Sequence, residues 1–177
     1  MRADWVHAEQ LKHILAAMMP ENRLAIETSL ATGLRIDDVL HLKTADLYKD
    51  RFTIKEMKTG KSRRLRLPDR LRDDLLAQAG RWWVFEGRND PRKCRTRQAV
   101  WKDLKRCAAL FRVSRSLSIS PHTARKIYAV SQYQRGRDLY KVQQLLNHSN
   151  EAVTMLYAMA DQLTARHTRG HKLNLPQ

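Results

Sequence analysis

The sequence has few cysteines and no long apolar run. Its only two cysteines, Cys94 and Cys107, lie thirteen positions apart, which argues against a disulfide framework and a CxxC site and favours a reducing cytoplasm. The opening segment MRADWVHAEQ has no apolar stretch of the kind found in a signal peptide. No run approaches the roughly 18 to 20 apolar residues of a membrane span. We therefore expect a protein that is neither secreted nor embedded in a membrane.

Acidic residues are also scarce. Thirty-four Lys and Arg stand against eighteen Asp and Glu, and this leaves a formal net charge of +16 over 177 residues. Between positions 88 and 115 there are ten basic residues but only Asp90 and Asp103 on the acidic side. Such a broad excess predicts a polyanionic partner, with nucleic acid first, although a charge run is often only a solvated face. With 42% hydrophobic residues, we expect one domain over 1–177.

The periodicity of the apolar residues predicts a mostly helical chain with one small antiparallel β-sheet, an α+β fold. Helices are expected over residues 7–18, 20–31, 36–42, 68–79, 96–111, 121–134, 138–146 and 151–159. Two alternating segments, 51–54 and 63–67, predict the strands, with the turn between them at 58–61. The apolar run 82–85 is either a short strand or a buried turn, and the polar stretch 86–95 is loop-like.

Five side chains have the chemistry needed to break a phosphodiester. Negative charge grows on the phosphate oxygens in the transition state, so fixed cationic hydrogen-bond donors are the main requirement. Arg35 and Arg125 can supply planar forks, and His122 and His148 can add further donors. Tyr157 carries a phenol that can attack phosphorus once its proton is taken. Taken singly these residues are weak signals, because a short motif such as HxxR is common by chance.

Their order and spacing are more specific. The segments TGLRIDDVLHLKTADL, KTGKSRRLRLP, PHTAR and LLNHSNEAVTMLY resemble the four signature blocks of the tyrosine recombinases, the phage integrase family, across nearly the whole chain. The resemblance implies the fold of that family's catalytic domain. It also implies six catalytic residues: Arg35, Lys58, His122, Arg125, His148 and Tyr157.

The resemblance implies a site-specific recombinase that integrates, excises or inverts DNA. Tyr157 would attack the phosphate to give a 3′-phosphotyrosyl link and a free 5′-hydroxyl, which then joins another strand. Lys58 would protonate the departing 5′-oxygen, with Lys61 as its rival. Because the covalent link keeps the energy of the phosphodiester, no metal, ATP or other cofactor is expected. Tyr128, Tyr133 and Tyr140 are weaker candidates for the nucleophile, and Tyr128 is expected to pack in the core.

The expected partner is a double-stranded DNA recombination site. Six side chains are candidate DNA contacts: Lys61, Lys93, Arg95, Arg97, Gln98 and Lys126. Lys93, Arg95 and Lys126 are expected to contact phosphate, and Arg97 and Gln98 are expected to contact bases. In the family, four subunits act on two sites, so a tetramer on two DNA sites is expected, together with a monomer in free solution. A cytoplasmic, nucleoid-associated protein encoded by a bacterium, phage or plasmid would fit this activity.

The chain departs from the family pattern in three places. Asn147 stands where a glycine is usual, Ala124 stands where a leucine is usual, and no separate N-terminal core-binding domain is evident. The chain is therefore interpreted as either a natural minimal recombinase or a truncated domain. Two other functions stay open: a DNA-binding regulator without catalysis, and relaxation of DNA in the manner of type IB topoisomerases. His167 and His171 have helical spacing, but zinc binding is not expected because they lack acidic neighbours.

Overall fold

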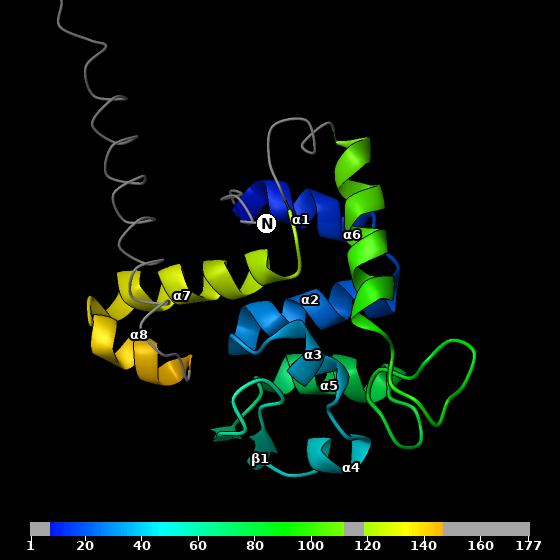
Figure 1. Cartoon of the computed structure of the whole chain (residues 1–177), viewed down its shortest axis with the longest axis horizontal. Helices are drawn as coiled ribbons and strands as arrows, with labels where there is room; N and C mark the ends of the chain where they lie inside the picture. The colour runs from blue at the N-terminus through cyan, green and yellow to red at the C-terminus, as the bar shows by residue number, and fades with distance from the viewer. Residues whose placement is uncertain (1–7, 112–118, 147–177) are drawn as a thin grey trace, which may run out of the picture. The chain divides into compact units, whose positions relative to one another are not determined.

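The computed structural model describes residues 8–111 and 119–146 (Figure 1). Its elements follow in the order α1 (Ala8–Ala16), α2 (Pro20–Thr32), α3 (Ile36–Leu40), α4 (Thr44–Leu47), β1 (Phe52–Lys55), β2 (Ser62–Leu65), α5 (Asp69–Gln78), α6 (Arg97–Leu110), α7 (His122–Gly136) and α8 (Leu139–Leu145). This confirms the prediction of a mostly helical α+β fold with one small antiparallel sheet. The predicted helix at 151–159 lies outside the described residues.

The chain divides into two compact units, and the boundary along the sequence falls within α7. The first unit ends at Tyr128 and the second begins at Ala129. In the second unit, Asp138 caps α8, and its side chain accepts a hydrogen bond of 3.0 Å from the backbone N–H of Lys141. No helix in the described part of the chain is long and apolar enough to cross a membrane. The single-domain organisation stays a prediction.

Local chemistry sets the helix boundaries as the sequence predicts. Pro20 begins α2, where its missing N–H costs nothing. Gly33 ends this helix in the left-handed conformation, with φ of 69°, and donates a 2.8 Å hydrogen bond to the carbonyl of Ser29. Thr96 caps α6 by accepting a 3.2 Å hydrogen bond from the N–H of Ala99. These boundaries place Arg35 and Arg97 at the starts of helices.

The core of the first unit lies among α1, α2 and α6, and α6 runs across the ends of the other two (Figure 1). Ile14 and Leu104 are both buried in this core. A buried carboxylate adds a polar tie: Asp103 on α6 accepts hydrogen bonds from the backbone N–H of Met19 at 2.9 Å and from the side chain of Asn22 at 2.8 Å. These contacts fix α6 against the start of α2.

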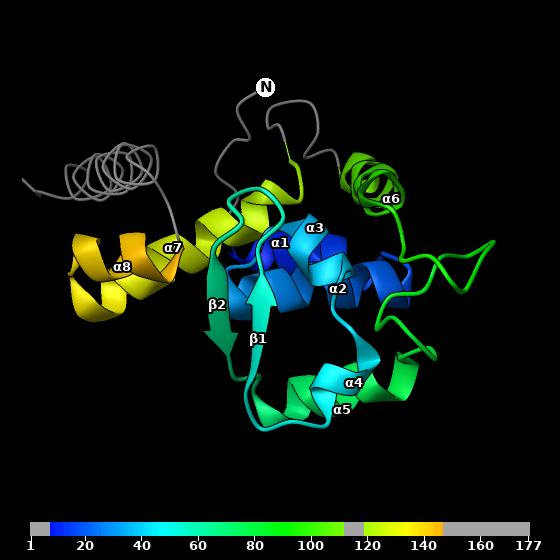
Figure 2. The same cartoon turned by 60° about the horizontal axis from the view of Figure 1, so that its bottom comes forward.

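The strands β1 and β2 form an antiparallel hairpin, and the loop that joins them lies toward α3 (Figure 2). Phe52 pairs with Leu65, and both side chains are buried. Beyond the strands, the N–H of Glu56 donates a 3.0 Å hydrogen bond to the carbonyl of Lys61. The hairpin is therefore closed on both sides of the predicted turn.

Three local features differ from the sequence prediction or resolve it. The short helix α4 was not predicted, because four residues are too few to show a helical period. The run 82–85 forms a buried turn and not a strand: Val84 and Phe85 are buried, and only Trp83 makes an isolated bridge, to Lys43. The helix expected over residues 96–111 ends at Leu110, and the Phe111 side chain, which the sequence placed on the apolar stripe of that helix, is 45% exposed, so that placement is wrong.

Candidate active site

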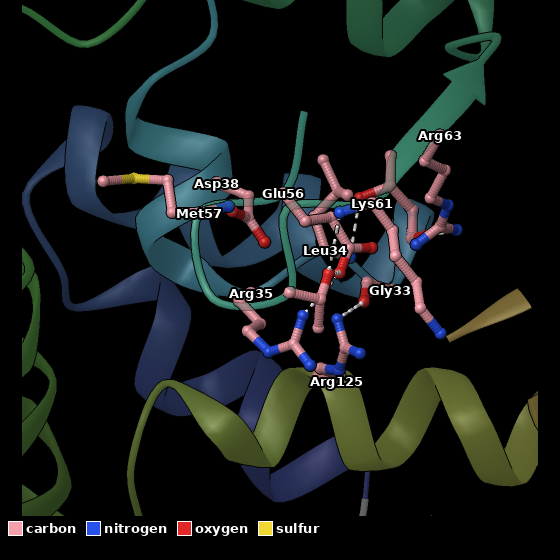
Figure 3. A network of polar contacts seen from close by, with 11 residues as sticks. Gly33, Leu34, Arg35, Asp38, Glu56, Met57, Lys61, Arg63 and Arg125 are labelled. Carbon is pink, nitrogen blue, oxygen red and sulfur yellow. Dashed lines mark hydrogen bonds and ion pairs between the residues drawn. The ribbon is translucent and has the colours of Figure 1, made fainter. Parts of the chain in front are cut away.

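Two arginines from distant parts of the sequence lie side by side in the first unit (Figure 3). Arg35 precedes α3, and Arg125 lies on the first turns of α7. Both are buried, and Arg125 donates a 2.7 Å hydrogen bond to the carbonyl of Gly33. Gly33 is required here because a Cβ atom would lie 2.3 Å from the Tyr128 ring. The turn after α2 therefore brings the two guanidinium groups together.

Burial and the neighbouring positive charges make the charged form of Arg125 costly. Burial, together with the nearby charges of Arg35 and Arg63, lowers the pKa of Arg125 to about 10, against the raising effect of Glu56 and Asp38. A guanidinium is otherwise almost impossible to deprotonate. Burial and the neighbouring cations therefore disfavour the charged form of Arg125, and a phosphate placed beside it would oppose that effect.

The β-hairpin is attached to this pair by a buried carboxylate. Glu56, just after β1, is fully buried and accepts a 2.6 Å hydrogen bond from Nη1 of Arg35. The same oxygen accepts a 3.0 Å hydrogen bond from the hydroxyl of Thr59. Lys58 lies between these two residues in the turn, and its side chain is exposed. Lys61, also exposed, is labelled with Glu56 in Figure 3.

Two further contacts fix the hairpin. Asp38 on α3 is buried and accepts a 2.9 Å hydrogen bond from the backbone N–H of Met57. Burial raises the pKa of Asp38, and Glu56 raises it further, against the lowering effect of the Met57 hydrogen bond. Arg63 on β2 donates a 2.5 Å hydrogen bond to the carbonyl of Thr32. The hairpin is thus held to both ends of the joint between α2 and α3.

His122 lies at the start of α7 and borders a groove of about 900 Å³. Desolvation lowers the pKa of His122, and the charges of Arg125, Arg97 and Arg35 lower it further. The imidazole is therefore neutral near pH 7 and able to accept a proton. The groove is also lined by Arg97 and Gln98 from the first turn of α6. Two of the predicted DNA-contacting residues thus share one surface hollow with a predicted catalytic residue.

The other predicted DNA contacts have different surroundings. Lys61 and Lys93 are exposed, and Lys126 is half-buried. Arg95 has a side chain that is only 11% exposed, and it donates a 3.1 Å hydrogen bond to the side chain of Asn22. This contact gives Arg95 a packing role between the start of α2 and the loop before α6. The DNA contacts of all six residues stay predictions.

The remaining catalytic candidates, His148 and Tyr157, lie outside the described residues. Of the rival tyrosines, Tyr128 is buried against Gly33, as its predicted packing role requires. Tyr140 is 69% exposed on α8. Within the two described ranges, no three His, Cys, Asp or Glu side chains are grouped to hold a metal ion.

Sequence reasoning missed two buried carboxylates that support the arginines. Asp38 follows Arg35 by three positions, a spacing that puts both on one side of the α3 turn. Glu56 continues the alternation of Phe52 and Ile54, so its side chain falls on the inward face of the hairpin. Both signals were available, but a Glu beside a lysine-rich turn is usually exposed.

The comparison with known families agrees with this geometry. Residues 4–163 match the phage integrase family. The chain belongs to that family. Tyrosine recombinase XerA of Thermococcus kodakarensis is 26% identical over 172 residues, which cover 91% of this chain and 58% of that protein. The probable integrase/recombinase YoeC of Bacillus subtilis is 30% identical over 140 residues, covering 76% and 75% of the two chains.

The fold is also that of the tyrosine-recombinase catalytic domains. The crystal structure of the XerH site-specific recombinase bound to difH substrate, in a pre-cleavage complex, superposes with a TM-score of 0.65 and 24% identity. The match covers 86% of this chain and 50% of XerH. The present chain therefore corresponds to little more than half the length of several of its relatives.

Proposed function

We propose that this chain is the catalytic domain of a site-specific recombinase that cuts and rejoins double-stranded DNA through a 3′-phosphotyrosyl intermediate. The observation that carries the proposal is the buried pair Arg35 and Arg125, set beside a hairpin that presents Lys58. Two planar forks suit the two non-bridging oxygens of one phosphodiester. Membership of the phage integrase family supports the same activity.

In the proposed reaction, Tyr157 attacks phosphorus while the arginines and His148 stabilise the charge that develops on the oxygens. His122, neutral near pH 7, accepts the proton of the phenol. The bond from phosphorus to the 5′-oxygen breaks, and Lys58 protonates that oxygen. A 5′-hydroxyl then attacks the phosphotyrosyl link and releases Tyr157. The bond is exchanged and not hydrolysed, so the reaction requires neither a metal ion nor ATP.

The partner that we propose is a DNA recombination site bound by four copies of the protein on two duplexes. The basic start of α6 and the groove beside it would face the DNA, with Arg97 and Gln98 toward bases and Lys61, Lys93 and Lys126 toward phosphates. The structure of XerH bound to difH supports a DNA partner for this fold. Because the substrate is DNA, we place the protein in the cytoplasm at the nucleoid.

The test is the capture of a covalent adduct. Duplexes bound by the wild-type chain are selected from a randomised library, nicked close to the cleaved phosphate so that the short product diffuses away, and incubated with protein in EDTA without nucleotide. We expect a protein–DNA band that resists denaturant with wild type and disappears with Tyr157→Phe. Sedimentation of the complex with two duplexes then reports the number of subunits.

Each other result points to a different function. A band that persists in Tyr157→Phe would contradict the assignment of the nucleophile. Wild-type protein that shifts DNA in a gel but never forms the adduct would identify a regulator. Relaxation of a supercoiled plasmid without joining of two sites would favour a topoisomerase.

A further inference from the structure

Glu56 is the most deeply buried charged side chain next to the proposed phosphate site. Its exposed fraction is 0%, and one of its oxygens lies 2.6 Å from Nη1 of Arg35. A buried carboxylate is costly unless it is paired and hydrogen-bonded. The short contact with Arg35 meets that requirement. Position 56 therefore requires a side chain that can reach from the hairpin and pair with the Arg35 guanidinium.

Glu56 also connects to the turn that carries Lys58. Its side chain accepts a 3.0 Å hydrogen bond from the Thr59 hydroxyl, and its backbone carbonyl accepts one of 2.8 Å from the N–H of Gly60. The backbone N–H of Glu56 donates to the carbonyl of Lys61 at 3.0 Å. One residue thus contacts the arginine on one side and three consecutive turn residues on the other.

We propose that Glu56 is a positioning residue that holds Arg35 and the Lys58 turn in one arrangement. The carboxylate aims the Arg35 fork, and its bond to Thr59 fixes the turn from which Lys58 reaches the leaving oxygen. This role rests on the proposed function. It follows from the contacts of Glu56 on both sides, since neither the arginine nor the turn can move without changing a bond to the same carboxylate.

Two variants separate the two contacts. Glu56→Gln keeps a side-chain oxygen but removes the charge that holds Arg35. Thr59→Val removes only the hydroxyl, at an exposed position where the fold tolerates the change. Glu27→Gln is the matched control, because Glu27 forms an exposed ion pair with Arg23 on α2. Thermal melting of each variant reports any effect on the fold.

The probe is the selected nicked duplex, made either with an ordinary 5′-bridging oxygen or with sulfur in its place. A thiol has a pKa near ~8.5, so it leaves as a thiolate without a general acid. We expect Glu56→Gln to slow adduct formation about 100-fold on both substrates, because a misplaced arginine affects the phosphate in each. Thr59→Val is expected to slow adduct formation about 10-fold on the oxygen substrate, which is part of the rate enhancement that a general acid contributes. On the sulfur substrate its rate should match that of wild type. Glu27→Gln should match wild type on both.

The outcomes are distinct. Wild-type rates for Glu56→Gln would overturn the proposal and leave the proposed function intact. Equal losses for Thr59→Val on oxygen and sulfur would overturn the link between Glu56 and the leaving-group acid. If Glu56→Gln does not fold, the proposal is tested by Thr59→Val alone, through the ratio of its adduct-formation rates on the oxygen and sulfur substrates. No adduct with wild-type protein would remove the proposed function and this role together.

Discussion

Replacing Arg125 by methionine should stabilise the free protein while it abolishes DNA cleavage. Arg125 is buried, with an exposed fraction of 6%, and it lies beside Arg35 and near Arg63. Its pKa falls to about 10 because burial and these neighbouring cations disfavour the charged form. Methionine fills similar space with no charge, and buried charges have been replaced by apolar side chains at no loss of stability elsewhere.

The expected gain can be worked from the pKa. A fall from an ordinary value above ~12 to about 10 means that the fold disfavours the Arg125 cation by about 3 kcal/mol. The substitution also leaves the Gly33 carbonyl without its 2.7 Å hydrogen bond, which costs about 1 to 2 kcal/mol. The net gain is about 1 to 2 kcal/mol, which in a chain of this size raises Tm by roughly 2 to 8 °C.

The opposite sign is expected at the neighbouring arginine. Arg35→Met removes the cation that lies 2.6 Å from the fully buried Glu56 carboxylate, and breaking such a pair costs about 3 to 5 kcal/mol. Its Tm should fall by roughly 6 to 20 °C. Arg70→Met, at an exposed position of α5, is the control for the loss of one positive charge. It should leave Tm nearly unchanged.

The assay is thermal unfolding of the four proteins with and without inorganic phosphate, followed by the adduct assay. Phosphate should raise Tm of wild type and of Arg70→Met, because an anion beside Arg125 offsets its desolvation. It should raise Tm of Arg125→Met less. The reasoning is refuted if Arg125→Met melts below wild type, or if phosphate stabilises it as much as it stabilises wild type.

Two further predictions concern His122 and Gly33. The His122 pKa lies below its ordinary value, so the stability contributed by the neutral ring is present above pH ~6.5 and is lost as pH falls through the folded-state pKa. NMR titration of the imidazole reads this pKa, and an ordinary or raised value would contradict the desolvated site. Gly33→Ala should cost about 2 to 5 kcal/mol, because the left-handed φ and a Cβ atom 2.3 Å from the Tyr128 ring both oppose it. Gly60→Ala, with a φ of 66° but nothing within 4 Å, should cost only about 1 to 2 kcal/mol; equal losses in urea unfolding would show that the ring contact is not the cause.

Much of the fold could be predicted because local chemistry decides it. Pro20, Gly33 and Thr96 mark helix boundaries through groups that belong to the same turn of chain. The hairpin turn could be predicted for the same reason, and with it the exposed position of Lys58. Phe111 was predicted to lie on the apolar face of a helix but is exposed beyond the end of α6. Helical periodicity shows which face of a helix is apolar, but it does not show at which residue the helix ends.

The site was only partly predictable because burial of a charged group depends on distant partners. The motif identified Arg35 and Arg125, and the strand alternation points Glu56 inward, but this local pattern does not show that a cation lies at the start of α3. That pairing joins residues 21 positions apart through the packing of the hairpin against the joint between α2 and α3. Charged side chains are assigned to the surface by default, so Glu56 and Asp38 were not identified as parts of the site.

The charges of the site indicate that it favours an anion bound in the interior over one bound at the surface. Arg125 is buried beside Arg35, and its pKa is lowered to about 10 chiefly because burial makes the charged form costly. An anion held at the surface by Lys61 or Lys93 would be screened by water and would not relieve that cost. Only an anion that becomes buried beside both guanidinium groups can do so. The same cation that lowers stability in the free protein therefore favours deep insertion of one phosphate over the many shallow contacts available along DNA.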